Sequence, residues 1–197
     1  MGKRGITLLL LGLLFFGPML FATFLYFKAD QFNFKLGNHG ELINPPLYLS
    51  KLNLEDFEHQ PIVQNNLKGK WWLVYLSPEQ CFNACHEILF NMRQIQTALG
   101  KEAHRVQRMV IAPSEREANP LDLFINQNYP DVQRALIRHE TYLKHFGKLG
   151  DPKDRAALGE LVLIDPNGQI VLYYDGDTPA KGMLTDIKRL LKISQIG

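Results

Sequence analysis

The sequence predicts an α/β fold, a mixed β-sheet flanked by helices, carried on a single N-terminal transmembrane helix. Three patterns support this prediction: an uncharged apolar run over residues 6–27, a shorter apolar run over residues 71–76, and the hairpin pattern "GELVLIDPNGQIVLYYDG". The predicted layout is a cytoplasmic N-terminus at 1–5, a transmembrane anchor at 6–27, a tether and lead-in at 28–60, and the folded domain at 61–197.

The first apolar run has the length of a membrane span, which needs about 20 apolar residues. A cleaved signal peptide would have a shorter apolar core and a small-x-small cleavage site, and neither is found here. Lys3 and Arg4 precede the run, which favours a cytoplasmic N-terminus. We therefore expect a single-pass protein of the inner (cytoplasmic) membrane whose C-terminal domain lies in the periplasm.

The charge balance and the number of cysteines limit the classes of function that the chain can have. The chain has 197 residues, with 22 Lys and Arg against 20 Asp and Glu. Because two of the basic residues precede the anchor, the rest of the chain is balanced, and we expect no nucleic-acid partner. A domain of this size needs no disulfide staples. The two cysteines therefore indicate a redox or metal-binding role in an oxidising compartment.

The first elements of the domain follow from local patterns. Residues 28–60 are turn-rich, and Pro45-Pro46 exclude a helix there. The near-continuous apolar run at 71–76 is typical of a strand buried on both faces. A helix is expected over residues 78–99, with Ser77 as N-cap, Gln80 completing a capping box, and Gly100 ending it.

The second half contains a strand, a hairpin and a helix. Residues 105–113, "RVQRMVIAP", predict a second strand, and the Pro-Asn-Gly turn at 166–168 predicts the hairpin. A C-terminal amphipathic helix begins near Thr178. Residues 115–150 give no clear assignment, although two pieces could form short helices. Strand, helix, strand, insertion, hairpin and helix is the order of the thioredoxin fold.

Both cysteines lie in the stretch "SPEQCFNACHE", at positions 81 and 85. On a helix this spacing places both sulfurs on one face, and the helix N-terminus favours thiolate over thiol. A thiolate is the nucleophile of disulfide exchange and also a soft ligand for Cu(I). The pair Cys81 and Cys85 therefore suits either role.

These motifs resemble the SCO/SenC family, and the stretches "GKWWLVYLSPEQCFNAC" and "LVLIDPNG" carry most of the resemblance. The resemblance implies a membrane-anchored thioredoxin-like protein that delivers Cu(I) to cytochrome c oxidase, or reduces thiols at its binuclear copper site. It implies an oxidase subunit or another assembly factor as partner. It also implies that Cys81 and Cys85 form the redox pair or hold the copper.

The sequence departs from the family at the third copper ligand. The family histidine would fall near Ala157, and no histidine follows His145. His86, His139 and His145 are the candidate replacements, although we expect His86 to be a partly exposed helix residue. The sequence therefore describes a divergent member, in which the copper site is incomplete or is completed from elsewhere.

Four other interpretations of the cysteine pair and its domain can be weighed against the sequence. A haem attachment site would need C-x-x-C-H, and "CFNACH" has one residue too many. A general thiol-disulfide oxidoreductase would carry a cis-proline before the hairpin, but no proline lies between Pro152 and Pro166. An inert disulfide and a non-catalytic assembly scaffold remain alternatives. We expect Cys81 to attack and Cys85 to resolve, since Cys81 lies nearer the helix end.

Overall fold

The structure is a computed structural model that describes residues 2–28, 37–63, 67–78, 83–113, 120–147 and 159–194. The chain divides into two compact units, Met1–Gly37 and Asn38–Gly197. The first unit contains one helix, α1 (Lys3–Lys28), of 26 residues. A search of the described residues for a helix with the length and hydropathy of a membrane span finds none. The membrane anchor therefore stays a prediction from the sequence.

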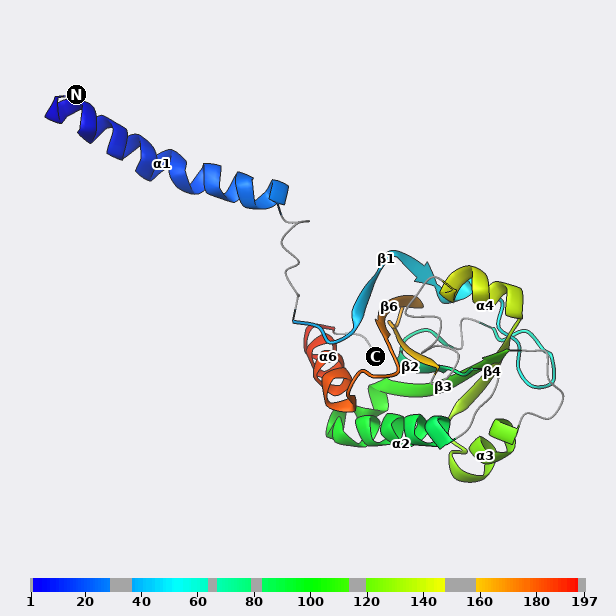
Figure 1. Cartoon of the computed structure of the whole chain (residues 1–197). Helices are drawn as coiled ribbons and strands as arrows, with labels where there is room; N and C mark the ends of the chain where they lie inside the picture. The colour runs from blue at the N-terminus through cyan, green and yellow to red at the C-terminus, as the bar shows by residue number, and fades with distance from the viewer. Residues whose placement is uncertain are drawn as a thin grey trace. The chain divides into compact units, whose positions relative to one another are not determined.

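The second unit is built on one mixed β-sheet (Figure 1), whose order in the described residues is β1-β6-β5-β2-β3-β4. Strands β2, β3 and β4 are parallel, whereas β5, β6 and β1 continue the sheet in antiparallel pairs. The strands are β1 (Glu41–Tyr48), β2 (Trp71–Leu76), β3 (Val106–Pro113), β4 (Gln133–Ile137), β5 (Glu160–Ile164) and β6 (Gln169–Tyr174). The mixed sheet predicted from the sequence is confirmed.

Helices cover both faces of this sheet. One face packs against α2 (Asn83–Ala98), α3 (Pro120–Asn128) and α6 (Ala180–Ile193), and the other against η1 (Leu49–Lys51) and α4 (His139–Phe146). A short 3-10 helix, η3 (Gly100–Arg105), joins α2 to β3. Each face has its own apolar core, so the sheet separates two hydrophobic layers.

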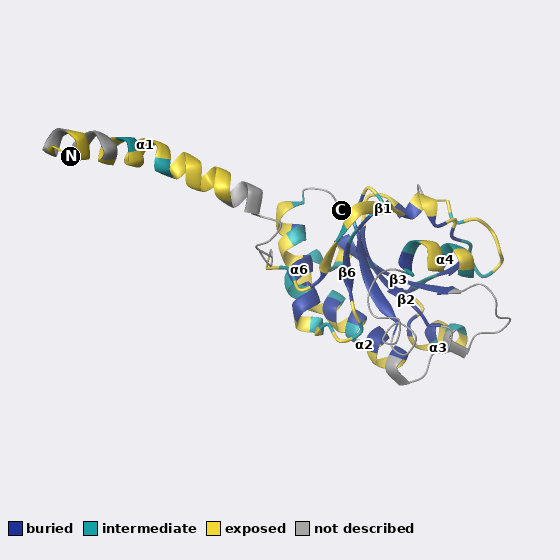
Figure 2. Ribbon diagram, turned by 45° about the horizontal axis from the view of Figure 1, so that its top comes forward, coloured by how far each residue is buried: buried dark blue, intermediate teal, exposed yellow. Residues whose placement is uncertain are grey.

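Strand β2 lies at the centre of these layers, and all six of its residues are buried. Side chains alternate along a strand, so Trp71, Leu73 and Tyr75 enter the core beneath α2. The intervening residues enter the opposite core. Figure 2 shows the central strands buried, whereas exposed residues lie on the outer sides of the helices, in loops and along the edge strand β1. The continuous apolar run in the sequence therefore reflects burial on both faces.

The structure differs from the predicted tether at residues 28–60, because the second half of that segment belongs to the domain. Strand β1 pairs with β6, and Leu49, Leu52 and Leu54 are buried in the core on the η1 side. Pro45 and Pro46 interrupt the β1 register between Leu42 and Leu47. Prolines cannot donate to a ladder and are tolerated on an edge strand. The sequence excluded a helix here correctly, but placed the domain boundary too late.

The segment left unassigned, residues 115–150, contributes α3, β4 and α4 in its described part. Strand β4 forms one edge of the sheet, and Glu55 covers it through two backbone hydrogen bonds with Leu136, of 3.0 and 2.7 Å. Each of the two residues donates its backbone N–H to the carbonyl of the other, so this part of the edge of β4 is paired. The insertion therefore extends the sheet beyond β3.

A buried carboxylate fixes the start of the domain onto α6. Asp186 is 1% exposed, and its Oδ2 accepts hydrogen bonds from the backbone N–H groups of His39 and Gly40, at 2.8 and 2.9 Å. Its Oδ1 lies 3.2 Å from Nδ1 of His39. Hydrogen bonds to a charged, buried acceptor are stronger than neutral ones. Asp186 therefore attaches the first residues of the domain to its last helix.

Replacing Asp186 by asparagine should lower the free energy of unfolding by about 2 kcal/mol, since a neutral amide accepts less strongly and brings two donors into a site of backbone N–H groups. Urea unfolding of residues 38–197 measures the loss. Asp177→Asn is the matched control, because Asp177 is exposed. Equal unfolding midpoints for the two variants would contradict this role.

Candidate redox site

Cys85 lies near the start of the described part of α2, and its side chain is completely buried. It is disulfide-bonded. The one other cysteine in the sequence is Cys81, which lies outside the described residues. The predicted helix over 78–99 is confirmed from Asn83 to Ala98, and residues 79–82 are likewise outside the described part.

Tyr75 of strand β2 contacts the sulfur of Cys85. Its hydroxyl donates a hydrogen bond to Cys85 Sγ at 3.1 Å, within the buried core. Tyr75 is fully buried and faces α2 because it shares the alternating face of Trp71 and Leu73. Burial, and to a lesser degree Tyr142, raises the pKa of Tyr75 well above its usual range. The hydroxyl therefore stays protonated and remains a donor at every physiological pH.

The chain between β2 and α2 is fixed at its beginning. The backbone N–H of Ser77 donates to the carbonyl of Ile111 at 2.9 Å, which continues the ladder between β2 and β3. The Ser77 hydroxyl donates to the carbonyl of Pro78 at 3.1 Å. The N-cap contact predicted for Ser77 would involve residues 79 and 80, which lie outside the described residues, so the capping box stays a prediction.

Gly159 closes the site from the side of β5. Its φ is +72°, and a Cβ at this position would lie 2.6 Å from the Leu76 carbonyl oxygen, 2.7 Å from the Tyr75 ring and 2.9 Å from Pro78. Thioredoxin-like enzymes would have a cis-proline in this segment, and here a glycine stands immediately before β5. The close approach lets β5 pair with β2 directly beside Tyr75.

The candidate ligand His86 turns away from the core toward α3. It is exposed, and its ring stacks on Phe124 with centroids 3.7 Å apart and an interplanar angle of 10°. Phe124 in turn contacts Tyr129 at 5.9 Å. The orientation of His86 thus follows from a packing contact, as expected for a partly exposed helix residue.

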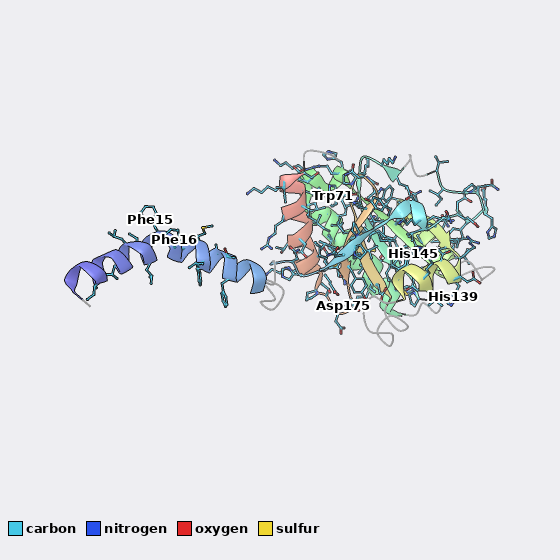
Figure 3. All side chains as sticks on the ribbon, turned by 90° about the horizontal axis from the view of Figure 1, so that it is seen from above. Phe15, Phe16, Trp71, His139, His145 and Asp175 are labelled. Carbon is cyan, nitrogen blue, oxygen red and sulfur yellow. The ribbon has the colours of Figure 1, made fainter. Side chains whose placement is uncertain are left out.

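The candidates His139 and His145 both belong to α4, at its first and seventh residues, and Figure 3 labels both on that helix. Burial, followed by the charges of Lys144 and Lys51, lowers the pKa of His145. Helix α4 packs through Tyr142 and Phe146 into the core that holds η1, so His145 belongs to the sheet face opposite Cys85. Within the described part of the chain, no three His, Cys, Asp or Glu residues group closely enough to hold a metal ion. Ala157, the position of the family histidine, lies outside that part.

Two residues of the site escaped the sequence analysis. In the sequence, Tyr75 looks like one more apolar residue of a buried strand. Only the alternation of side chains along β2 could have indicated that its hydroxyl faces α2. Gly159 looks like an ordinary turn residue before a hairpin. The atoms that exclude a side chain at this position belong to segments distant in the sequence, so the sequence gives no sign of them. Chemically, the arrangement presents a buried sulfur with a permanent donor, which suits a thiol that alternates between disulfide and thiolate.

The fold and this site define a thioredoxin-like protein with a disulfide-bonded cysteine at the helix that follows its central strand. A family model described as "Transmembrane-like, thioredoxin-like, C-terminal domain" matches residues 71–194. Because the match covers more than half of the chain, the chain belongs to this family. No curated protein matches the sequence.

Solved structures with the same fold include Sco proteins. Copper-bound yeast Sco1 is 18% identical with a TM-score of 0.57, over 78% of this chain and 95% of its own. BsSco, described as a member of the Sco family of cytochrome c oxidase assembly proteins, is 20% identical with a TM-score of 0.52, over 79% and 98%. A thiol:disulfide interchange protein from Bacteroides sp. is 15% identical with a TM-score of 0.51, over 79% and 91%. These identities establish a shared fold, and they agree with the predicted resemblance to a divergent SCO-like protein.

Tyr75→Phe should make the reduction potential of the cysteine pair more negative by about 20 mV. The lost hydrogen bond, worth about 1 kcal/mol, favours a thiolate acceptor over a disulfide sulfur. The pKa of the Cys85 thiol should rise for the same reason. Equilibration of residues 38–197 with thiol redox buffers measures the potential. Tyr48→Phe is the control, because that hydroxyl is exposed and contacts Gln169; the same potential in both variants would contradict the role of Tyr75.

Proposed function

We propose that this chain is a membrane-anchored, thioredoxin-like factor that exchanges disulfides with a protein partner through Cys81 and Cys85 during cytochrome c oxidase assembly. The observation that carries the proposal is the disulfide-bonded, buried Cys85 with the Tyr75 hydroxyl on its sulfur. The fold shared with Sco proteins and with a thiol:disulfide interchange protein supports it. The partner is an oxidase subunit or another assembly factor.

In the reducing direction, the thiolate of Cys81 attacks one sulfur of the partner disulfide. A mixed disulfide forms, and the other partner sulfur leaves as a thiolate that takes up a proton. The thiolate of Cys85 then attacks Cys81 Sγ, which forms the intramolecular disulfide and releases the second partner thiol. Two electrons and two protons pass to the partner. Tyr75 acts in the second step, because its hydroxyl stabilises the Cys85 thiolate before attack.

The cellular location is part of the proposal. The apolar residues of α1 and the basic residues before them support an inner-membrane anchor with a cytoplasmic N-terminus and a periplasmic domain. Such an anchor would confine the thiol chemistry to the membrane surface, where membrane-bound partners are assembled.

The test of exchange is to trap the mixed disulfide. Cys85→Ser should accumulate a covalent complex with a partner through Cys81, since no resolving thiol remains, whereas Cys81→Ser should accumulate none. Non-reducing electrophoresis of membranes from cells that carry each variant measures the complex. Full oxidase assembly with both cysteines replaced by serine would overturn the redox proposal and leave a scaffold.

Cu(I) transfer is the second candidate, with copper as cargo rather than a resident cofactor. The copper-bound yeast Sco1 structure supports it through the shared fold. The described residues offer Cys85 as one ligand only after the disulfide is reduced. The ring of His86 stacks on Phe124, and His145 belongs to α4, which packs on the sheet face opposite Cys85. His139 follows the carboxyl end of β4, which runs parallel to β2, so it lies at the sheet edge where β2 also ends and is the remaining candidate for a third ligand.

An anaerobic Cu(I) titration of reduced residues 38–197 against a competing chelator tests this candidate. One tightly held equivalent, lost in Cys81→Ser and weakened at least tenfold in His139→Gln, is the result expected for copper transfer. His145→Gln serves as the matched control and should bind as the parent does. Absence of binding, together with normal trapping of the mixed disulfide, would leave thiol exchange alone.

A further inference from the structure

The exposed charged side chains of α6 are all basic. Lys181, Lys188 and Lys192 are exposed and recur at helical spacing on one side of the helix, whereas the single acidic residue of α6, Asp186, is buried. Figure 2 shows α6 buried on its inner side and exposed on the outer one. No acidic side chain of α6 therefore offsets these three lysines.

The basic surface continues onto η3. Arg105 of η3 donates hydrogen bonds to the carbonyls of Leu191 and Ser194, at 3.0 and 2.8 Å, so η3 lies against the end of α6. Exposed Lys101 and His104 belong to the same short helix, and Lys70 Nζ lies 3.4 Å from the His104 carbonyl. We call the set Lys70, Lys101, His104, Lys188 and Lys192 the basic face.

The acidic residue of η3 is paired with an arginine. Glu102 of η3 forms a 2.9 Å salt bridge with Arg105. The hydrogen bond from Arg105, with the charges of Arg105, Lys101 and His104, lowers the pKa of Glu102. The negative charge of Glu102 is therefore offset mainly by its partner Arg105.

An apolar side chain projects beside the basic face. Ile193 follows Lys192 and is 77% exposed, more than any other large apolar side chain described in the domain. Lysines that flank an exposed aliphatic side chain fit a lipid surface, where the cations meet anionic headgroups and the apolar group enters the interface. A nucleic acid would use the charges but not Ile193.

The covalent connection to α1 starts at this helix. The first residues of the domain, His39 and Gly40, are held by Asp186 of α6. Residues 29–37 separate the end of α1 from the start of the second unit. Nine residues span at most about 32 Å, so an anchored chain would keep α6 at a high effective concentration near the bilayer.

We propose that the basic face of α6 and η3 docks on the anionic lipid headgroups of the membrane that holds α1. Docking would orient the domain relative to the bilayer. The inference rests on the membrane attachment proposed above but not on the thiol chemistry.

Vesicle sedimentation of residues 38–197 tests the proposal without α1, since this unit contains the whole described sheet and both cores. Vesicles of phosphatidylcholine with about one third phosphatidylglycerol should bind the domain, and pure phosphatidylcholine should not. Binding should weaken at high salt. Each lysine near an anionic surface is worth about fivefold in affinity, so the double variant Lys188→Glu, Lys192→Glu should bind at least about thirtyfold more weakly.

Lys144→Glu is the matched control, because Lys144 is exposed on α4, on the other face of the sheet. It should bind as the parent does, and Ile193→Ser should weaken binding while keeping its salt dependence. Equal binding to neutral vesicles, or an equal loss in the control, would overturn the proposal. Absence of any vesicle binding would also overturn it and would favour an acidic protein as the partner of this face. Mixed-disulfide trapping is independent of each of these results.

Discussion

The burial of β2 on both faces is the constraint on which the rest of the structure depends. A six-residue strand with no exposed side chain needs an apolar layer on each side, and α2 with α6 provides one while η1 with α4 provides the other. Because α2 must return over the sheet from the end of this strand, the cysteine near its start lies at a fixed place. The chemistry of the site is therefore positioned by packing, and Tyr75 is the strand residue that reaches it.

Patterns that arise from a few neighbouring residues could be predicted from the sequence. The burial of β2, the hairpin from Glu160 to Tyr174 and the amphipathic α6 each depend on local periodicity or on a turn, and each is present. The thioredoxin-like order followed from these elements. The position of Cys85 on the helix after β2 followed as well, because a strand and a helix separated by few residues leave little freedom.

Features that depend on contacts between distant segments could not be predicted. Strand β1 carries two prolines and an exposed pattern, so only its pairing with β6 identifies it as a strand. The contact between Tyr75 and Cys85 and the approach of Gly159 to Leu76 each join separate elements. His145 was a candidate ligand only because its segment had no assignment, and the side of the sheet on which it lies became evident with the fold.

The contact between Gly159 and β2 also limits how this protein can change during evolution. The nearest obstacle to a Cβ at position 159 is the Leu76 carbonyl oxygen, a backbone atom that no side-chain substitution can remove. A lineage that gained a histidine or a proline here would have to shift β5 against β2 and lose part of their pairing. Substitution at position 159 is therefore a costly route by which the site could acquire a new side chain.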